Sequence, residues 1–351
     1  MNPFHRLGIL DTEPLIIRAS TLWHVMNPVW EIGHHLKGHK TYFLLNLSWS
    51  LLHGDRFKVL MACYALYRQA FPEHEMIFLC NEEPEMKLLT KFNIPAVFAP
   101  HNALIDYNLF QIHENEEKIY DGIMNSRLDS FKRHILARKL DSMALITYYT
   151  PVGGKSRAER YLSYLRRNMP NCNFLNFDDQ GDYRYLDKQE IALAVSQSHT
   201  GLIFSDVEGG CMAACEFLLA GIPVVSTTNQ GGRDLFLPPE HSRTIEPTFD
   251  NAKKAVEELK SEQIDPYEIR EECIRRITGY RQNFIDAWQM IYDLEGIQKN
   301  ARELFEKQYY HLMAKNIYVD DIIKLFESIK NNEFEYDSAT QPMIYYDQLF
   351  Q

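Results

Sequence analysis

The feature that most constrains the fold is an alternation of short apolar runs with longer amphipathic stretches. Runs such as 42–48, 76–80 and 201–204 have the length of buried strands, and the stretches between them carry apolar residues at helical spacing. Strands of four to seven residues separated by helices are typical of a parallel sheet covered by helices. We therefore predict an α/β protein.

The alternation occurs twice along the chain, which predicts two Rossmann-like domains. The first series ends near residue 99, and the second begins with the apolar run 144–149. Between them, 117–142 is expected to be helical in large part, and a helical segment follows the second series. The expected domains are an N-terminal, acceptor-side domain of 1–142, a C-terminal, donor-binding domain of 143–283, and helices with a tail over 284–351 that cross back to the N-terminal domain.

Composition narrows the class of protein. The chain has 351 residues, of which 45% are hydrophobic, and a net charge of −11, which disfavours nucleic acid as a partner. Six cysteines form no CxxC pair, and no apolar run reaches the length of a membrane span. The N-terminus lacks the pattern of a secretory signal. These features predict a cytoplasmic protein with no integral membrane segment, although peripheral membrane contact stays possible.

The first 40 residues include the histidine-rich segment GHHLKGH (33–39). Gly33 and Gly38 make a helix unexpected there. We expect no metal site in this segment.

Two glutamates in the segment 205–232 need an explanation. Glu208 stands just before Gly209 and Gly210, and Glu216 interrupts a helix that is otherwise small and apolar. A structural interpretation has Glu208 starting the helix and Glu216 facing water. That interpretation exposes much apolar surface, because the helix is apolar on nearly all sides.

The alternative interpretation is a ligand site at the start of this helix. In an open parallel sheet, ligands bind beyond the carboxyl ends of the strands, and a helix N-terminus there attracts a diphosphate. Glycines 209 and 210 let an anion approach the backbone. The two glutamates are eight residues apart, which at the rise of a helix separates their backbones by roughly 12 Å along the axis and places both on broadly one face. A nucleotide-diphosphate sugar places its ribose and its sugar ring at about that distance, and carboxylates accept hydrogen bonds from hydroxyl pairs.

The pattern S-x-x-E-G-x₆-E, followed by AGIPVVST and a Gly-Gly loop, resembles the donor-binding signature of GT-B glycosyltransferases, in particular the family 4 (group 1) enzymes with an E-x₇-E motif. The resemblance implies that Glu216 binds the ribose and that Glu208 faces the donor sugar. The other donor-binding residues that the signature implies are Ser205, Gly209, Gly210, Gly231 and Gly232.

The resemblance also implies a basic pair after the first strand of the C-terminal domain, which neutralises the diphosphate. With 144–149 as that strand, Lys155 and Arg157 are the candidates. Transfer with retention, without a metal or other cofactor, is the implied chemistry. A positive region supports this assignment: between 127 and 167 there are ten Lys or Arg residues and three acids.

The acceptor side is expected in the N-terminal domain. His53 follows the first apolar strand and His101 follows the third, and a histidine suits proton transfer near neutral pH. We therefore group His53 and His101 with Glu208 as catalytic candidates. Four further side chains, expected on the helix that leads into the second domain, have a weaker case: Asn125, Arg127, Lys132 and His134.

The sequence predicts a glycosyltransferase that moves a sugar from a nucleotide-diphosphate sugar to the hydroxyl of a small-molecule, glycan or peptide acceptor. A non-catalytic relative that binds nucleotide sugars is the first alternative. A dinucleotide-dependent oxidoreductase is the second, but it needs a G-x-G-x-x-G turn after a strand, and the sequence has none.

Overall fold

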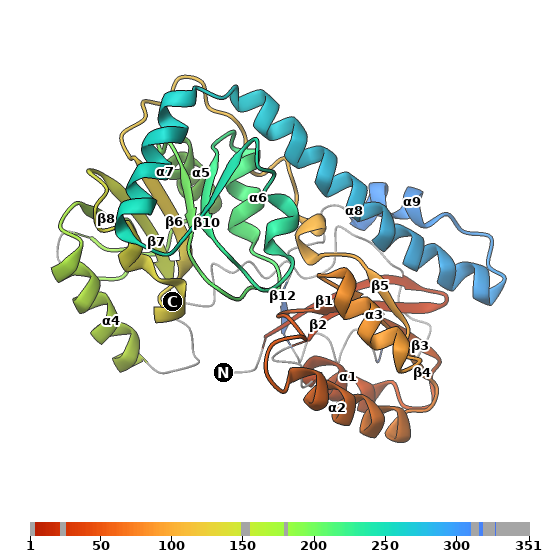
Figure 1. Cartoon of the computed structure of the whole chain (residues 1–351). Coiled ribbons are helices and arrows are strands. Elements are labelled where there is room, and N and C mark those ends of the chain that lie inside the picture. Colours follow the sequence, from red (N-terminus) through yellow and green to blue (C-terminus); the bar gives the residue numbers. More distant parts are fainter. Residues whose placement is uncertain are drawn as a thin grey trace. The chain divides into compact units, whose positions relative to one another are not determined.

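A computed structural model describes residues 4–21, 26–148, 155–178, 182–309, 316–318 and 327. The chain divides into two compact units (Figure 1). Unit 1 comprises Met1–Asp106 together with Ile277–Gln351, and unit 2 comprises Tyr107–Arg276. Each unit has its own six-stranded sheet.

The sheet of unit 1 has the strand order β12-β1-β2-β3-β4-β5. Strands β2 to β5 are parallel, whereas β1 runs antiparallel to both β2 and β12. The strands are β1 (Phe4–Thr12), β2 (Leu15–Thr21), β3 (Thr41–Leu47), β4 (His74–Cys80), β5 (Ala96–Phe98) and β12 (Asn316–Tyr318).

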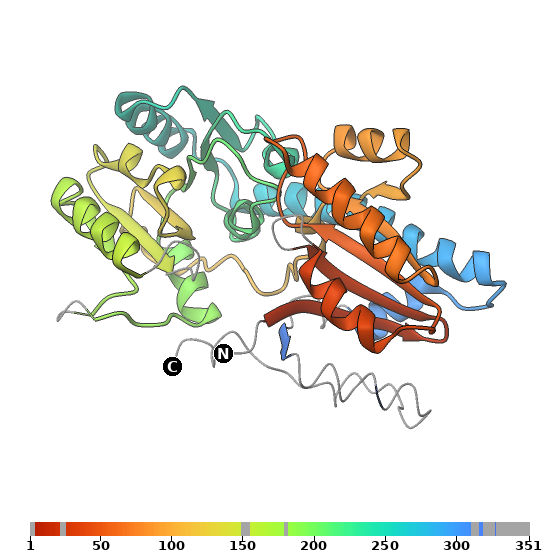
Figure 2. The same cartoon turned by 90° about the horizontal axis from the view of Figure 1, so that it is seen from below.

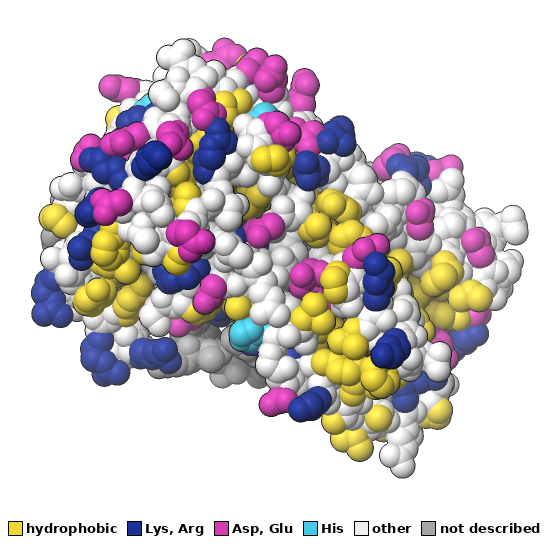
Figure 3. Space-filling view, viewed as in Figure 1, with side chains coloured by type: hydrophobic (Ala, Val, Ile, Leu, Met, Phe, Trp, Pro, Cys, Tyr) yellow, Lys and Arg dark blue, Asp and Glu magenta, His cyan; other side chains and the backbone are white. Residues whose placement is uncertain are grey.

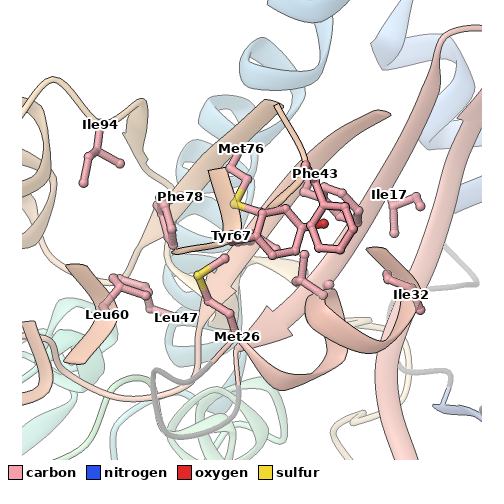
Figure 4. Close-up of a cluster of buried hydrophobic side chains, with 14 of the residues drawn as sticks. Ile17, Met26, Ile32, Phe43, Leu47, Leu60, Tyr67, Met76, Phe78 and Ile94 are labelled. Atoms are coloured by element: carbon pink, nitrogen blue, oxygen red, sulfur yellow. The ribbon is translucent and has the colours of Figure 1, made fainter. Parts of the chain in front are cut away.

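Helices cover both faces of this sheet (Figure 2). On one face, α1 (Asn27–His35), α2 (Arg56–Ala70) and α3 (Glu83–Lys91) pack in one apolar cluster with β2, β3 and β4 (Figure 4). On the other face, the second half of α8 (Pro266–Glu295) and the short α9 (Ala301–Leu304) pack on β1, β2 and β3. A turn of π-helix, Phe305–Tyr309, follows α9.

Helix α1 contradicts the expectation that glycines exclude a helix near residue 33. A Cβ atom on Gly33 would lie 2.6 Å from the Tyr67 hydroxyl oxygen and 3.2 Å from the Phe71 ring. The glycine therefore lets α1 approach the large aromatic side chains of the cluster in Figure 4. The low helical propensity of one glycine costs about 1 kcal/mol, which the packing of the cluster offsets.

The sheet of unit 2 is wholly parallel, with the order β11-β10-β9-β6-β7-β8. Numbered within the unit, this is the doubly wound order 3-2-1-4-5-6, and the strand order reverses between β6 and β9. The strands are β6 (Gly122–Arg127), β7 (Met143–Tyr148), β8 (Cys172–Phe174), β9 (Gly201–Ile203), β10 (Val224–Thr227) and β11 (Ser242–Ile245). The helices are α4 (Lys155–Asn168), α5 (Lys188–Ser196), α6 (Met212–Leu219), α7 (Phe249–Glu262) and the first part of α8.

Two expectations differ from the structure in the middle of the chain. The stretch 117–142 is not mainly helical: it contains β6 and two short 3₁₀ turns, Ser130–Lys132 and His134–Ala137. The unit boundary falls at 106/107 and not at 142/143, because β6 pairs with β7 along six residues and belongs to unit 2. The second crossing, at 276/277, lies inside α8.

No helix in the described part of the chain is both long and apolar enough to span a bilayer.

Candidate functional site

The site is built where β6 and β9 lie side by side in unit 2. After β6 the sheet continues to one side through β7, and after β9 it continues to the other through β10. The loops that follow these two strands therefore diverge, and this is the place where parallel sheets bind ligands. The segments concerned are 128–134, after β6, and 204–211, after β9.

Glu208 is buried in the loop after β9, with 4% of its surface exposed. Its Oε1 atom accepts a hydrogen bond from the Ser205 hydroxyl at 2.6 Å and forms an ion pair with the Lys132 ammonium group. Lys132, in the loop after β6, is also buried. A buried carboxylate needs such partners, and removal of one partner from a buried ion pair typically costs 3–5 kcal/mol.

The Gly-Gly loop after β10 lies directly against the Glu208 loop. Gly231 has a φ of +123°, and a Cβ atom there would lie 1.5 Å from the carbonyl oxygen of Glu208. The Glu208 amide donates to the Gln230 carbonyl at 3.0 Å, and the Gly232 amide donates to the Gly209 carbonyl at 2.8 Å. Only glycine fits at position 231, because the two backbones pass this closely.

Two arginines that the sequence did not single out hold the ends of β9 and β10 together. Arg233 is fully buried and donates to the carbonyls of Ser205 (2.9 Å) and Thr227. Arg133 has a left-handed backbone and donates to the Phe204 carbonyl and to the Thr227 hydroxyl. Lys132 and these arginines concentrate positive charge at this end of the sheet, beside the buried Glu208.

His134 supports the loop that carries Lys132 and Arg133. Its Nε2 atom lies 2.9 Å from the Ser126 hydroxyl, and its Nδ1 atom lies 3.2 Å from the Tyr161 hydroxyl. Burial lowers the pKa of His134 to about 3, and the Lys132 charge acts in the same direction. The imidazole is therefore neutral at physiological pH, which makes it a support for the loop and not a proton donor.

Helix α6 starts at Met212, four residues after Glu208. The distance of roughly 12 Å assumed that both glutamates stand on one helix. That assumption is wrong, since Glu208 lies in the preceding loop. In the described part of the chain, no side chain caps the N-terminus of α6, although the Ala214 amide donates to the Cys211 carbonyl at 3.0 Å. The partial positive charge of a helix N-terminus favours an anion at this position.

Glu216 lies on the partly exposed side of α6. Its Oε2 atom accepts a hydrogen bond of 3.0 Å from Nδ2 of Asn125, on β6. Burial raises the pKa of Glu216 to about 7, while the Asn125 hydrogen bond and the charge of Lys188 act against that rise. The carboxyl group therefore changes its charge within the physiological range.

Lys155 and Arg157 are on α4, which follows β7. They were chosen because 144–149 was taken as the first strand of the domain, but β7 is the second strand, and β6 precedes it. The Arg157 side chain is exposed, and the Lys155 side chain lies outside the described residues. Arg127 ends the first strand, and Lys132 and Arg133 follow it. A strand assignment for GIMNSR would have identified these three residues.

Two other cations of the segment 127–167 have partners on or beside α7. Lys139 pairs with Asp250 on α7, and the guanidinium of Arg138 lies 3.9 Å from the ring centre of Phe249. Acidic and basic side chains are interspersed on the face seen in Figure 3. Arg127, Lys132 and Arg133, in contrast, lie at or just after the carboxyl end of β6.

His53 and His101 both belong to unit 1. His53 is half-buried between β3 and α2, and it lines a shallow opening with Gly54, Asp55, Arg56 and Val59. His101 follows β5, and its Nδ1 atom and backbone amide are both 3.1 Å from Oδ1 of Asn81. Their catalytic roles stay predictions.

A buried glutamate, Glu85, organises the loops that carry these histidines. One oxygen accepts the Leu51 amide at 2.7 Å, and the other accepts the Asn81 and Glu82 amides at 2.9 and 3.2 Å. Burial raises the pKa of Glu85 to about 7, although the three amide hydrogen bonds lower it. In sequence, this residue resembles any glutamate in the first turn of a helix.

No family model matches the chain, and no curated protein matches its sequence. Its fold is similar to those of several solved structures. Sucrose-phosphate synthase from Thermosynechococcus elongatus aligns with a TM-score of 0.55 at 12% identity, over 80% of this chain and 74% of that chain. Anabaena HepE in complex with UDP aligns with a TM-score of 0.53 at 11% identity, over 75% and 82%.

A third similar structure is an α,α-trehalose-phosphate synthase (UDP-forming) from Burkholderia xenovorans in complex with glucose-6-phosphate. It aligns with a TM-score of 0.51 at 11% identity, over 72% of this chain and 68% of that chain. At these identities the similarity concerns the fold. It confirms the predicted GT-B fold, an α/β architecture of two Rossmann-like units with a C-terminal helical segment. The E-x₇-E group within that fold is not distinguished by these similarities.

Proposed function

We propose that this protein is a glycosyltransferase that uses a nucleotide-diphosphate sugar. The observation that carries the proposal is the cluster at the β6–β9 switch point: two glutamates lie on either side of an uncapped helix N-terminus, beside a buried lysine. This arrangement provides acceptors for sugar hydroxyls and positive charge for phosphates.

In this proposal Glu216 accepts hydrogen bonds from the ribose hydroxyls, and Glu208 faces the donor sugar. The diphosphate lies against Gly209 and Gly210, where the α6 amides and Lys132 stabilise the negative charge that develops as the sugar leaves. Lys132 takes the place that the sequence assigned to Lys155 and Arg157, because it follows the first strand of the sheet.

Transfer proceeds in this proposal without a metal and with retention, to an acceptor hydroxyl. His53 and His101 are the candidates for contact with that acceptor. Uridine nucleotides are the donors to test first, since the HepE structure contains UDP and the Burkholderia enzyme is named as UDP-forming.

The test is a thermal-shift panel of nucleotide-diphosphate sugars with and without EDTA, on the wild type and on Glu216→Gln. We expect at least one donor to raise the melting temperature in EDTA, and the variant to lose that rise. Glu257→Gln, an exposed glutamate on α7, is the matched control and keeps the shift. A shift that requires divalent metal, or that survives in Glu216→Gln, contradicts the proposed mechanism.

Binding alone does not distinguish an enzyme from a binding protein. Release of the nucleotide diphosphate in the presence of an acceptor pool separates the two. Donor binding with neither transfer nor hydrolysis favours the non-catalytic alternative.

A further inference from the structure

We propose that Asn125 is a positioning residue for the nucleotide: its amide holds one oxygen of Glu216, so that the carboxylate presents the other oxygen to the ribose. The inference rests on the proposed function, because it assigns the ribose to Glu216. It concerns a residue that contacts the carboxylate, not the donor.

The geometry of β6 places the Asn125 side chain next to α6. Side chains alternate between the two faces of a strand. Met124 packs in the apolar cluster with α4 and α7, so Asn125 points to the opposite face. There its Nδ2 donates to Oε2 of Glu216 across 3.0 Å. Its position near the carboxyl end of β6, beside β9, lies at the switch point of the sheet.

The chemistry of the two groups determines which oxygen stays available. An amide nitrogen is a donor only, and an ionised carboxylate is an acceptor only. The hydrogen bond therefore fixes the orientation of the carboxylate and stabilises its ionised form. Oε1 then remains as an acceptor for a hydroxyl pair, and ribose offers two adjacent hydroxyl donors.

The electrostatic surroundings of Glu216 support this role. Burial raises its pKa to about 7, and the Asn125 hydrogen bond is the largest opposing effect. Lys188, in the first turn of α5, is the charged side chain in the described structure whose field also favours the ionised form. Loss of the Asn125 amide thus raises the pKa of Glu216 further, and nucleotide binding then requires a higher pH.

The experiment measures UDP affinity by isothermal titration calorimetry from pH 5.5 to 8.5, or the affinity of whichever nucleoside diphosphate binds in the panel. Asn125→Leu removes the donor at similar volume, and Asn125→Asp keeps the shape but adds a like charge. We expect Asn125→Leu to bind about tenfold more weakly near pH 6.5, in line with the loss of a hydrogen bond to a charged group. Its affinity rises toward the wild-type value at pH 8.5.

Asn125→Asp is expected to shift the pH profile in the same direction and by more. Asn173→Leu, at an exposed position on β8, is the matched control and leaves the profile unchanged. Should Asn125→Leu fail to fold, the aspartate variant, which has the shape of the wild-type side chain, still gives the result.

A second measurement tests whether Asn125 acts through the ribose contact. UDP and 2′,3′-dideoxy-UDP are compared on the wild type and on Asn125→Leu. If Asn125 acts through Glu216 on the ribose, the two losses are not additive, because both remove the same interaction. Additive losses, or a pH profile of Asn125→Leu identical to that of the wild type, overturn the inference.

The two proposals fail in different ways. If the wild type binds no nucleotide, the proposed function is wrong, and the inference fails with it. If the wild type binds through Glu216 but the Asn125 variants match it at every pH, only the inference is wrong.

Discussion

A comparison of Glu85, in unit 1, with Glu216, in unit 2, shows how the partners of a carboxyl group relate to its role. Burial raises the pKa of each carboxyl group to about 7. Glu85 is completely buried, and both its oxygens accept backbone amides from two loops. Glu216 is partly exposed and receives one side-chain hydrogen bond. Similar pKa values therefore accompany different roles, and the partners of the carboxylate distinguish them.

Glu208 is a third glutamate for this comparison. It differs from the other two because its ion pair with Lys132 offsets the cost of burying its charge. Lys132→Met removes that cation and leaves a buried carboxylate without its ion pair. We expect a loss of about 4 kcal/mol in the free energy of unfolding. Urea denaturation of the variant measures it.

The control for this variant is Lys139→Met, since Lys139 pairs with Asp250 at the surface and is expected to cost less than about 1 kcal/mol. Equal losses in the two variants would mean that the Lys132–Glu208 pair is not held in a buried environment.

Glu85→Ala tests the structural role that the comparison assigns to Glu85. The substitution leaves three backbone amides without their acceptor, so we expect a loss of about 3 kcal/mol in the free energy of unfolding. Glu83→Ala, on the exposed side of the same helical turn, is the matched control in urea denaturation. If the stability of Glu85→Ala is close to that of the wild type, Glu85 does not have the structural role that distinguishes it from Glu216.

Glu216→Gln tests the nucleotide-binding role that we propose for Glu216. It keeps the shape of the side chain and removes a charge whose burial is unfavourable, so the free energy of unfolding does not fall. Nucleotide affinity, in contrast, falls by at least about tenfold, since hydrogen bonds to a charged acceptor are lost. Chemical denaturation and calorimetry on the same preparation give both values. A variant that is strongly destabilised yet still binds nucleotide reverses the assignment.

A last effect is expected on the pH dependence of stability. The folded-state pKa of Glu216 is raised to about 7, from 4.5, so between these values the folded protein binds more protons at this group than the unfolded chain does. The contribution of Glu216 to stability therefore falls as pH rises from about 4.5 to about 7.

Replacement of Glu216 by glutamine removes this contribution. The decrease in melting temperature between pH 5 and pH 8 is thus smaller in Glu216→Gln than in the wild type. Melting curves over this range measure it, and an unchanged pH dependence would show that the pKa of Glu216 is not raised.

Much of the fold could be predicted because most strands are short apolar runs. The run 42–48 corresponds to β3 and the run 144–149 to β7. Strand β6 was missed for a physical reason: its second half, Asn-Ser-Arg, is polar and only partly buried, because it lies at the carboxyl end of the strand. A search for apolar runs therefore misses β6, because the polar residues that belong to the candidate site interrupt its apolar pattern. The unit boundary and the choice of Lys155 and Arg157 followed from that omission.

The sequence by itself determined the α/β class, the repeated alternation and the segment that holds Glu208, Glu216 and the Gly-Gly loop, because these are local patterns of hydrophobicity and spacing. Tertiary structure alone decided which distant residues meet them. Asn125 reaches Glu216 across 91 positions, and Lys132 reaches Glu208 across 76. Such pairs arise from the order of strands in a sheet, and strand order depends on contacts between segments that no local pattern encodes.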